Sequence, residues 1–320
     1  MTKSKSGYIY IILCTLIFSM VEVVLKTVQG VFAPLQINAL RFFFGGLTLL
    51  PFALRSVRRK GTRLGFSDLR FFLLMGLLFI PITMSIYQLS VELTRASAVA
   101  VIFSCNPIFI VVLAYFVLHE ELHYNHIIAL VIELIAIVII VDPLHNAIAP
   151  LGALFAILSA LLFSVYSVIG KTRTARYGGI AVTCFSFICG ATEQFILLLL
   201  GRIPAVSAFL RSVGLGVYAD VPLFENIPAS ALPALVYICA VNTGLGFVCH
   251  MLAMEKTSAK EASLVFFFKP MLAPIFALIF LKEAITLNMA IGIFLFMVGA
   301  GFSVLPGLIA EKRAQRLQSK

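Results

Sequence analysis

The feature that most constrains this chain is an internal duplication in which each copy has an odd number of predicted membrane spans. Residues of the first half recur in the second half, first 145 and then 163 positions later: Phe18/Phe163, Ser19/Ser164, Lys26/Lys171, Thr27/Thr172 and Gly45/Gly190, then Glu92/Glu255, Thr94/Thr257, Ala96/Ala259, Pro107/Pro270, Glu120/Glu283, Asn125/Asn288 and Pro143/Pro306. Extra chain between about Gly201 and Ser230 accounts for the larger offset. Because the number of spans is odd, the second copy must enter the bilayer in the opposite direction. This inverted repeat is typical of secondary transporters, whose site lies near the membrane midplane between the copies.

Long apolar segments recur along the whole sequence and exclude a soluble globular protein. The chain is 61% hydrophobic and 12% charged, with a mean hydropathy of +1.08. A helix needs about 20 apolar residues to cross the hydrocarbon core. Ten segments meet this need, and none shows the short alternation of a β-barrel strand: Tyr8–Lys26, Pro34–Leu54, Leu69–Leu89, Ala96–Leu118, Tyr124–Val141, Leu151–Gly170, Ile180–Leu200, Leu232–Met254, Ala262–Leu281 and Leu287–Leu305. We therefore predict an all-α integral membrane protein of ten transmembrane helices, built as two inverted five-helix repeats (1–146 and 147–306) with a basic cytosolic tail (307–320).

The net charge of +10 is distributed as membrane topology requires. If the N-terminus is cytoplasmic, most basic residues fall on the cytoplasmic side: Lys3, Lys5, Arg55, Arg58, Arg59, Lys60, Arg63, Arg70, Lys171, Arg173, Arg176, Lys256, Lys260, Lys312, Arg313, Arg316 and Lys320. Only Arg95, Arg202, Arg211 and Lys282 fall on the far side. This positive-inside bias predicts a multi-pass protein of the cell membrane with both termini in the cytoplasm, and no nucleic-acid partner.

Neither a disulfide framework nor a cleaved signal peptide is predicted. The cysteines all fall within predicted spans and form no CxxC pair. The basic N-terminus resembles a signal peptide, but Glu22 and Lys26 interrupt its apolar run, and the segment has a repeat partner in Leu151–Gly170. We interpret it as a retained span. The loop from Gly201 to Ser230 is interpreted as a tolerated surface insertion rather than a gate or lid.

One short motif indicates a different class, an intramembrane zinc protease. The segment His119-Glu120-Glu121-Leu122-His123 is an HExxH sequence. On a helix its two histidines face one way and can bind Zn²⁺, while the glutamate acts as a general base, and Asp142 is a candidate third ligand. However, Glu120 recurs as Glu283 without the histidines, and the segment lies at the mouth of a span. The protease is kept as the alternative, and we predict no metal, no cofactor and no catalytic residues.

Polar residues within the spans are candidates for function, because a charge at the bilayer centre costs about 2.5–3.5 kcal/mol on insertion scales. They are Glu22, Lys26, Arg41, Glu133, Glu193, His250 and Lys269. Glu22 and Lys26 are spaced i, i+4 and can neutralise each other. Arg41 and Glu193 lie near span ends, where they can snorkel or pair. Glu133 has no charged repeat equivalent and is interpreted as a structural partner.

Lys269 is the leading candidate for contact with a substrate. It directly precedes Pro270, and its repeat equivalent Asn106 precedes Pro107, so both copies are expected to carry a kinked, polar midpoint. Two such kinks in pseudo-symmetric spans suit a central binding site. A pair of Lys269 with Glu22 that only holds the halves together explains the lysine equally well. Glu22 is accordingly either that partner or a proton-coupled carboxylate.

Three further polar residues are secondary candidates for the same cavity: Tyr87, Tyr166 and Asn242. Each is also explained by ordinary packing or by an interhelical hydrogen bond. Phe103 and the run Phe266-Phe267-Phe268 are candidates for its aromatic walls, with core packing as the default interpretation.

Several of these segments resemble a known family. Thr94-Arg95-Ala96-Ser97-Ala98-Val99-Ala100, Asn106-Pro107-Ile108-Phe109 and Glu120 resemble the signature of the EamA domain, as does the second copy from Thr257 through Lys269-Pro270 to Leu281-Lys282-Glu283. Arg41-Phe42, Gly45 and Pro51 resemble its second helix. The chain is thus similar over nearly its whole length to ten-helix proteins of the drug/metabolite transporter superfamily. The resemblance implies alternating access, with a cavity lined by helices one, three, four, six, eight and nine; the long Gly201–Ser230 loop departs from the pattern.

Taken together, these features predict a secondary-active transporter that exports a small metabolite such as an amino acid, an amine or a drug-like solute. The predicted substrate contacts are Lys269, Asn106, Glu22, Tyr87, Tyr166 and Asn242. The expected partners are the small-molecule substrate and the lipid bilayer, while a coupling ion and a homodimer stay open. A non-transporting receptor or scaffold is a third hypothesis.

Overall fold

The computed structural model describes residues 5–119, 123–142, 149–225, 227–257, 259–262 and 264–318. In the first half, the first span consists of α1 (Lys5–Ser19) and α2 (Val21–Thr27), and the second of α3 (Pro34–Arg59). The third span is made of α4 (Phe66–Leu77), η1 (Leu78–Met84) and α5 (Ser85–Leu93). The fourth comprises α6 (Ala96–Phe103) and α7 (Asn106–Leu118), and the fifth is α8 (Tyr124–Val141).

The second half repeats this order with one insertion. The sixth and seventh spans are α9 (Pro150–Tyr177) and α10 (Gly179–Leu200), followed by the inserted α11 (Pro204–Ser212), η2 (Gly216–Tyr218) and η3 (Ala229–Ala231). The eighth span comprises α12 (Leu232–Val236), η4 (Tyr237–Leu245) and α13 (Gly246–Lys256). The ninth contains α14 (Ala259–Ala262), α15 (Leu264–Phe276) and η5 (Ala277–Leu281), and α16 (Leu287–Gln318) is the tenth.

The described residues confirm an all-helical membrane fold. Nine helices among them are long and apolar enough to cross a bilayer, and the apolar helix Leu287–Ser303 is a shorter tenth. Large apolar side chains also cover outer faces of these helices: on α8, Val131, Leu134, Ile135 and Val138 are all exposed. A bilayer solvates such a surface, whereas water would not.

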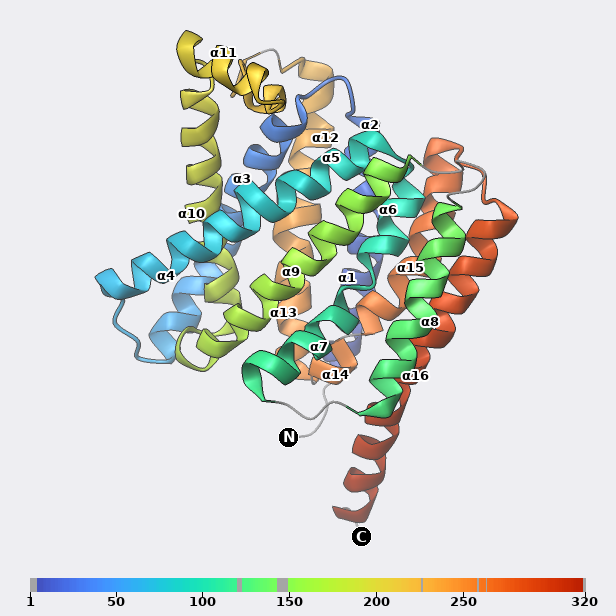
Figure 1. Cartoon of the computed structure of the whole chain (residues 1–320). Coiled ribbons are helices and arrows are strands. Elements are labelled where there is room, and N and C mark those ends of the chain that lie inside the picture. Colours follow the sequence, from blue (N-terminus) through green and yellow to red (C-terminus); the bar gives the residue numbers. More distant parts are fainter. Residues whose placement is uncertain are drawn as a thin grey trace.

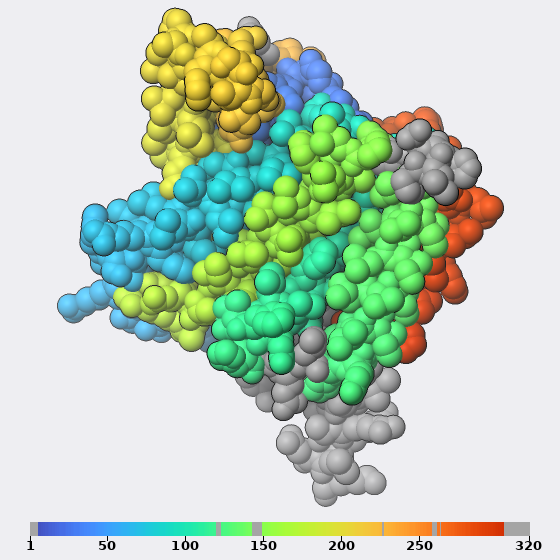
Figure 2. Space-filling view, viewed as in Figure 1, coloured from blue at the N-terminus to red at the C-terminus, as the bar shows by residue number. Residues whose placement is uncertain are grey.

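Each repeat packs mainly against the other repeat rather than against itself. The first and second spans pack on the eighth and ninth: α1 lies against α13 and α15, and α3 lies against η4. The sixth and seventh spans in turn pack on the third and fourth: α9 lies against α5, α6 and α7, and α10 lies against α4 and η1. Figures 1 and 2 show α9 running between the α4–α5 span and α7, with α8 and α16 as a separate pair at the side. The two copies are therefore interlocked.

Two glycines show that the sequence repeat is also a repeat of contacts. A Cβ at Gly45 would lie 2.6 Å from Thr243 Cγ2 of η4, and one at Gly190 would lie 2.6 Å from Ile80 Cγ1 of η1. Gly190 follows Gly45 by 145 positions, and Thr243 follows Ile80 by 163. The same close crossing is thus built twice, once in each direction across the interface between the repeats.

The helices that line this interface are irregular. The third and eighth spans each contain a π-helical segment, η1 and η4, a feature that often marks functional sites. The fourth span is interrupted at Ser104 and Cys105, directly before Asn106. The ninth stays helical through Lys269 and Pro270. We expected similar kinks in both copies, but the interruption occurs only in the first.

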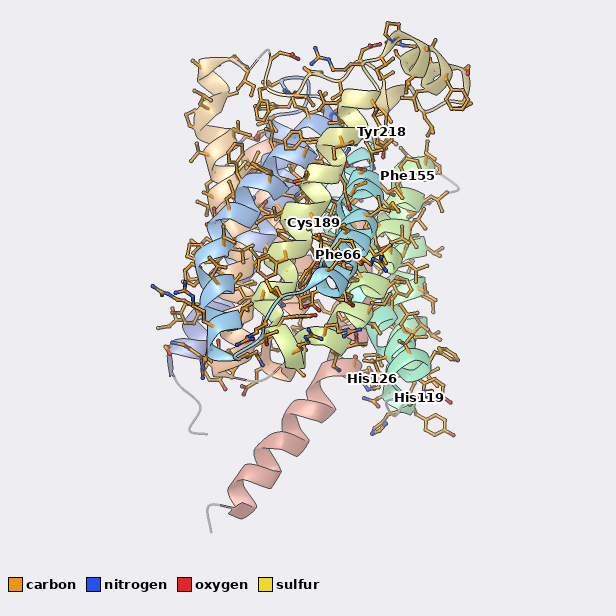
Figure 3. The ribbon with its side chains drawn as sticks, turned by 90° about the vertical axis from the view of Figure 1, so that its left-hand side faces the viewer. Phe66, His119, His126, Phe155, Cys189 and Tyr218 are labelled. Atoms are coloured by element: carbon orange, nitrogen blue, oxygen red, sulfur yellow. The ribbon has the colours of Figure 1, made fainter. Side chains whose placement is uncertain are left out.

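The insertion between Gly201 and Ser230 is packed against the first repeat. The hydroxyl of Tyr218 donates to the carbonyl of Pro81 in η1 at 3.1 Å, and Gln36 Nε2 of α3 donates to the carbonyl of Leu223 at 3.2 Å. Tyr218 lies at the end of the molecule opposite to His119 and His126 (Figure 3). The insertion therefore covers one end of the helix bundle.

One carboxylate holds the insertion together internally. Ser207 and Arg211 of α11 donate to Asp220 at 2.5 and 3.0 Å, and these hydrogen bonds keep the pKa of Asp220 below its usual value. Because the folded-state pKa is lowered, the contribution to stability is present at neutral pH and is lost as the pH falls through that lowered pKa.

The close crossing at Gly190 gives a first prediction. A Cβ there would lie 2.4 Å from the backbone oxygen of Gly76, so Gly190→Ala forces the two helices apart and costs about 1–3 kcal/mol. Purified protein should melt at a lower temperature.

Gly170→Ala is the matched control. Its Cβ would meet only ordinary contacts, the nearest 3.6 Å away, and alanine favours a helix by about 1 kcal/mol. Its melting temperature should stay the same or rise. Equal melting of the two variants would contradict the interlocked packing at Gly190.

Candidate functional site

A buried ion pair joins the two repeats. Lys269 Nζ of α15 lies 2.6 Å from Glu22 Oε1 of α2, with side-chain exposures of 4% and 0%. The hydroxyl of Tyr87 in α5 donates to the same oxygen at 2.7 Å. Glu22 Oε2 is buried and has no hydrogen-bond partner among the residues described. The carboxylate thus has one oxygen engaged twice and one oxygen with unused bonding capacity.

Local sequence places these groups inside the bundle. The hydroxyls of Thr15 and Ser19 bond back to carbonyls one turn earlier in the first span, which weakens and bends a helix. The regular helix stops at Ser19, and Glu22 follows in the first turn of α2. In the ninth span, Pro270 directly follows Lys269 and lacks an amide hydrogen. The carbonyl of Phe266, one turn earlier, therefore has no helical hydrogen-bond donor.

Arg41 is a second buried cation near this pair, so of the two alternatives that we considered for it, snorkelling or pairing, the first does not hold. It is 4% exposed and does not snorkel to the surface. Its Nη2 bonds Asn38 Oδ1 at 3.3 Å, and its guanidinium lies 4.4 Å from the ring centre of Phe42 and 5.7 Å from that of Tyr87. Its Nε has no hydrogen-bond partner in the described part of the chain. The spacing of Asn38, Arg41 and Gly45 along one helix face was the available signal.

The charges in this cluster do not balance. Lys269 and Arg41 are cations and Glu22 is an anion, and all three side chains are buried. No salt bridge is recorded for Arg41 among the described residues. The cluster therefore has one positive charge in excess when all three groups are ionised, a costly arrangement within a bilayer.

An aromatic row connects the ion pair with the sixth span. The ring of Phe103 lies 4.8 Å from Tyr87 and 5.4 Å from Phe163, and Lys269 Nζ lies 5.4 Å from its centre. The ring of Phe163 also contacts that of Tyr166, which is buried and stacks on Phe79 at 4.3 Å. Tyr166 is thus reached from the ion pair through aromatic contacts.

Asn106 lies at the interrupted fourth span, close to the same row. It is fully buried, its Nδ2 donates to the carbonyl of Phe103 at 2.9 Å, and its own carbonyl accepts from Ser164 Oγ at 3.0 Å. Its Oδ1 has no partner among the described residues. Asn106 therefore presents an unused acceptor beside the aromatic ring that Lys269 covers.

Asn242 and Gln88 add further unused polar atoms. Both are buried, and both side-chain amide groups are without hydrogen-bond partners in the residues described. Asn242 lies in η4, which packs on the helix that carries Arg41. Native proteins rarely leave such groups unpaired unless a water, an ion or a ligand completes them.

The structure brings the six predicted site residues together to different degrees. Lys269, Glu22 and Tyr87 are in direct contact. Asn106 and Tyr166 are linked to them through Phe103 and Phe163, and Asn242 lies on a neighbouring element.

The geometry required for a zinc protease is absent from the residues described. The helix α7 ends at Leu118 and α8 begins at Tyr124, so His119 and His123 do not share a helix; Glu120–Leu122 lie outside the described residues. No cluster of His, Cys, Asp or Glu in the described part of the chain could hold a metal. Asp142 instead accepts a hydrogen bond from Asn288 Nδ2 at 2.7 Å.

At one end of the interface between the repeats, a carboxylate of the second repeat bonds to the first repeat beside a half-buried lysine contact. Lys26 Nζ donates to the carbonyls of Val91 and Thr94 at 2.8 and 3.0 Å. Glu283 accepts from the amides of Ala96 and Ser97 at 2.9 and 3.1 Å, and so caps the N-terminus of α6. Figure 1 shows this junction of α2, α5 and α6 at the end covered by the insertion. Glu283 therefore joins the two repeats at this end, whereas Lys26 ties α2 to the end of α5 within the first repeat.

Comparisons with known proteins agree with this architecture. The profile of the EamA-like transporter family matches residues 5–142 and 150–305. A protein of Clostridium kluyveri named an uncharacterized transporter is 33% identical over 305 residues, which cover 92% of each chain. A Bacillus subtilis protein, the uncharacterized transporter YoaV, is 25% identical over 297 residues, covering 90% of this chain and 93% of its own.

A solved crystal structure has the same fold. It superposes with a TM-score of 0.64 at 19% identity, and the match covers 94% of this chain and 97% of the other. The two proteins therefore share an arrangement of helices.

The ion pair gives a second prediction. Lys269→Met leaves Glu22 as an uncompensated buried charge, which costs about 3–5 kcal/mol, so purified protein should melt at a clearly lower temperature. Adding Glu22→Gln removes that charge, and the double variant should recover most of the lost stability.

The isosteric Glu22→Gln alone leaves Lys269 unpaired and should also destabilise the protein. The coupling between the two changes, measured as a double-mutant cycle, should be large. Additive effects would contradict a direct pairing in the folded membrane protein.

Proposed function

The chain belongs to the EamA-like transporter family, and from that premise we propose that it is a secondary-active transporter that exports a small metabolite across the cell membrane by alternating access. The observation that carries the proposal is the Glu22–Lys269 pair, which joins the two interlocked repeats and lies near buried polar atoms that have no partner among the described residues. The proposed substrate contacts are the predicted residues, to which we add Arg41. Both termini are proposed to be cytoplasmic on the positive-inside bias.

The charges favour a substrate that carries an anionic group. A carboxylate placed near Arg41 and Lys269 would neutralise the excess positive charge and could bond the unpaired Nε of Arg41. The free oxygen of Glu22 and the amides of Gln88 and Asn242 could accept or donate bonds to a polar or amine group. The ring of Phe103 could pack against an apolar part. A small amphiphilic acid or zwitterion meets all three conditions.

The arrangement also supports a mechanism. A substrate that binds Lys269 competes with Glu22 for the ammonium group, and thereby loosens the contact between the repeats. Glu283 bridges the repeats at one end in the described conformation, and we expect pseudo-symmetry to provide a related bridge at the other end in the alternate conformation. Exchange between these two conformations would expose the site to either side of the membrane in turn.

The third prediction concerns substrate charge. Pairs of small metabolites that differ only in a carboxylate and its amide are compared for thermal stabilisation of purified protein. We expect the carboxylate to bind at least about tenfold more tightly, because a charge-assisted bond in a buried site contributes about 1.5–3 kcal/mol. Arg41→Gln should abolish the difference.

Flux in proteoliposomes then tests transport itself. A carboxylate that stabilises the protein should exchange across the membrane, and inside-out vesicles should accumulate it if the direction is export. Arg41→Lys retains a charge and should lose only part of the preference. Equal binding of acid and amide would contradict the anionic substrate, and an absence of flux with every stabilising compound would favour a receptor or scaffold.

The fourth prediction concerns the end that Glu283 bridges. Glu283→Gln removes charge-assisted hydrogen bonds to the amides of Ala96 and Ser97, so hydrogen exchange at these two amides should be at least about tenfold faster. Glu225→Gln is the control, since Glu225 is a half-exposed carboxylate that pairs with Arg202 and should leave both amides unchanged. Unaltered exchange in Glu283→Gln would show that this contact does not hold the end closed.

A further inference from the structure

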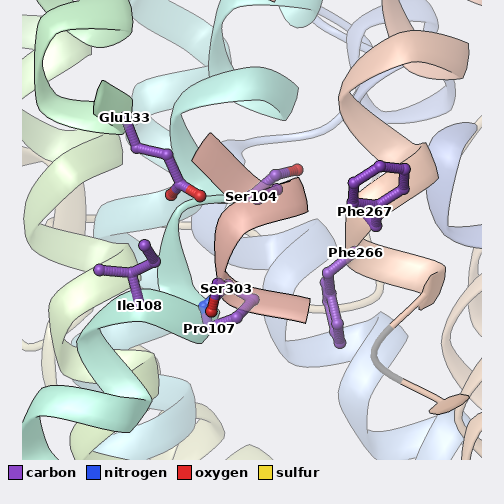
Figure 4. Close-up of a pocket in the computed structure, with 8 residues that line it drawn as sticks. Ser104, Pro107, Ile108, Glu133, Phe266, Phe267 and Ser303 are labelled. Carbon is purple, nitrogen blue, oxygen red and sulfur yellow. The ribbon is translucent and has the colours of Figure 1, made fainter. Parts of the chain in front are cut away.

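A second polar site lies apart from the ion pair, in a small cavity between the interrupted fourth span and the α8–α16 pair. Its volume is about 20 Å³, which is room for one water molecule. Figure 4 shows the carboxyl group of Glu133 projecting into this space from α8. The lining residues are Ser104, Pro107, Ile108, Glu133, Phe266, Phe267, Ala300 and Ser303.

The carboxyl group of Glu133 has no salt-bridge partner within the described ranges, so the ionic pairing that a structural partner would make is not seen there. Its side chain is 3% exposed, and Glu133 Oε2 has no hydrogen-bond partner among the described residues. It lies near the middle of the 18-residue helix α8. A lone carboxylate anion at that depth is not stable without compensation, so the group is neutral in this arrangement.

The neighbouring elements offer few titratable groups. From the interruption between α6 and α7, the buried thiol of Cys105 lies within electrostatic reach of Glu133. The helix α16 contributes none between Leu287 and Ser303. On α15 the nearest in sequence to the cavity lining is Lys269, which is engaged by Glu22. On α8 itself, His126 lies two turns earlier, and its Nδ1 is 3.1 Å from Ser303 Oγ.

We propose that this cavity is a proton-binding site, in which Glu133 carries the proton that couples transport to a pH gradient. The coupling part rests on the proposed function, whereas the protonation does not. The site is separate from the Glu22–Lys269 pair, where one carboxylate oxygen is already held by an ammonium group and a phenol. Glu22 and Glu133 thus have different tasks: Glu22 binds within the substrate site, and Glu133 exchanges a proton.

The composition of the cavity favours a proton over a metal ion. Among the described residues that line it, only Glu133, Ser104 and Ser303 bring side-chain oxygens, and the others are apolar. The hydroxyl of Ser104 is already used, since it donates to the carbonyl of Ala100 at 2.6 Å. A sodium ion requires a shell of several oxygen ligands, whereas a proton requires a single carboxyl oxygen.

The structure also indicates how the proton could leave. When water enters the cavity, the O–H bond of the Glu133 carboxyl breaks, its electron pair stays on the carboxylate, and the proton passes to the water. Ser303 and its neighbour His126 extend this polar path along α8 toward the end where His126 lies (Figure 3). The N-terminus of α7, at Asn106 and Pro107, places partial positive charge at the cavity and stabilises the anion that remains.

Infrared difference spectroscopy of the full-length protein in lipid tests the protonation without a substrate. At pH 7, wild-type protein should show the carbonyl stretch of a protonated carboxyl group that is missing in Glu133→Gln. Titration to alkaline pH should remove this band. Glu133→Asp should retain a band at a shifted frequency, and Glu255→Gln, which changes an exposed carboxylate paired with Arg59, should leave the wild-type band in place.

Two spectroscopic results would overturn the proposal. If wild-type and Glu133→Gln spectra do not differ in the protonated carboxyl region at pH 7, Glu133 does not hold a proton. If sodium chloride removes the band at constant pH while choline chloride does not, the cavity binds a sodium ion instead. Melting temperatures of the variants establish that each is folded before its spectrum is compared.

Flux measurements then test the coupling. In proteoliposomes, a pH gradient should drive net flux by wild-type protein and by Glu133→Asp, while Glu133→Gln should retain solute exchange and lose its response to the gradient. Gradient-driven flux in Glu133→Gln would overturn the coupling role. If no solute moves at all, the proposed transport function fails, and the infrared band alone decides whether the cavity binds a proton.

Discussion

The cost of placing charge inside a bilayer is the constraint on which the organisation of this protein depends. An isolated charge at the membrane centre costs about 2.5–3.5 kcal/mol on insertion scales, so a buried ionic group must be paired, neutralised or hydrated. Glu22 and Lys269 satisfy this requirement only when the two repeats are packed together, because one residue comes from each. The ion pair therefore links the assembly of the fold to the formation of the site. A solute that exchanges for one of its partners acts on the contact between the repeats.

Much of the scaffold could be predicted from the sequence, since hydropathy and repeat spacing follow from simple physical requirements. Ten apolar segments predicted the helices, and the offset that relates Gly45 to Gly190 reappears as a pair of equivalent helix crossings. The individual contacts were less accessible. Lys269 was assigned a partner in Glu22 only as one of two interpretations. Snorkelling and pairing both stayed open for Arg41, because a hydropathy boundary does not say which way a helix face turns. That orientation is set by packing against η4 and η1, which depends on the whole bundle.

The interruption of the fourth span shows a different limit of sequence reasoning. Asn106-Pro107 and Lys269-Pro270 are equivalent in the repeat, yet only the first is preceded by non-helical residues. A proline removes the same hydrogen bond in both copies, so the difference must come from the surroundings. Ser104 bonds back to Ala100, and Asn106 bonds back to Phe103. Asn106 thereby satisfies the Phe103 carbonyl that Pro107 leaves without a donor, whereas its repeat equivalent Lys269 bonds Glu22 instead.

The scaffold is repeated in the two halves, but its buried charged residues are not, so the two halves have different chemistry. The repeat equivalents of Glu22 and Arg41 are Ser167 and Ser186, that of Lys269 is Asn106, and that of Glu133 is Phe296. The duplicated glycine crossings allow two related conformations, one closed at each end, as the inverted-repeat construction requires. The unduplicated charges ensure that these conformations do not hold two equivalent sites. Glu133 shares its cavity with Pro107 of the interrupted span and with Phe266 and Phe267 of the continuous ninth span, so proton exchange there acts on the two equivalent spans through different contacts. A proton and a solute can in this way bind at different elements of one bundle and still shift the same equilibrium between the two conformations.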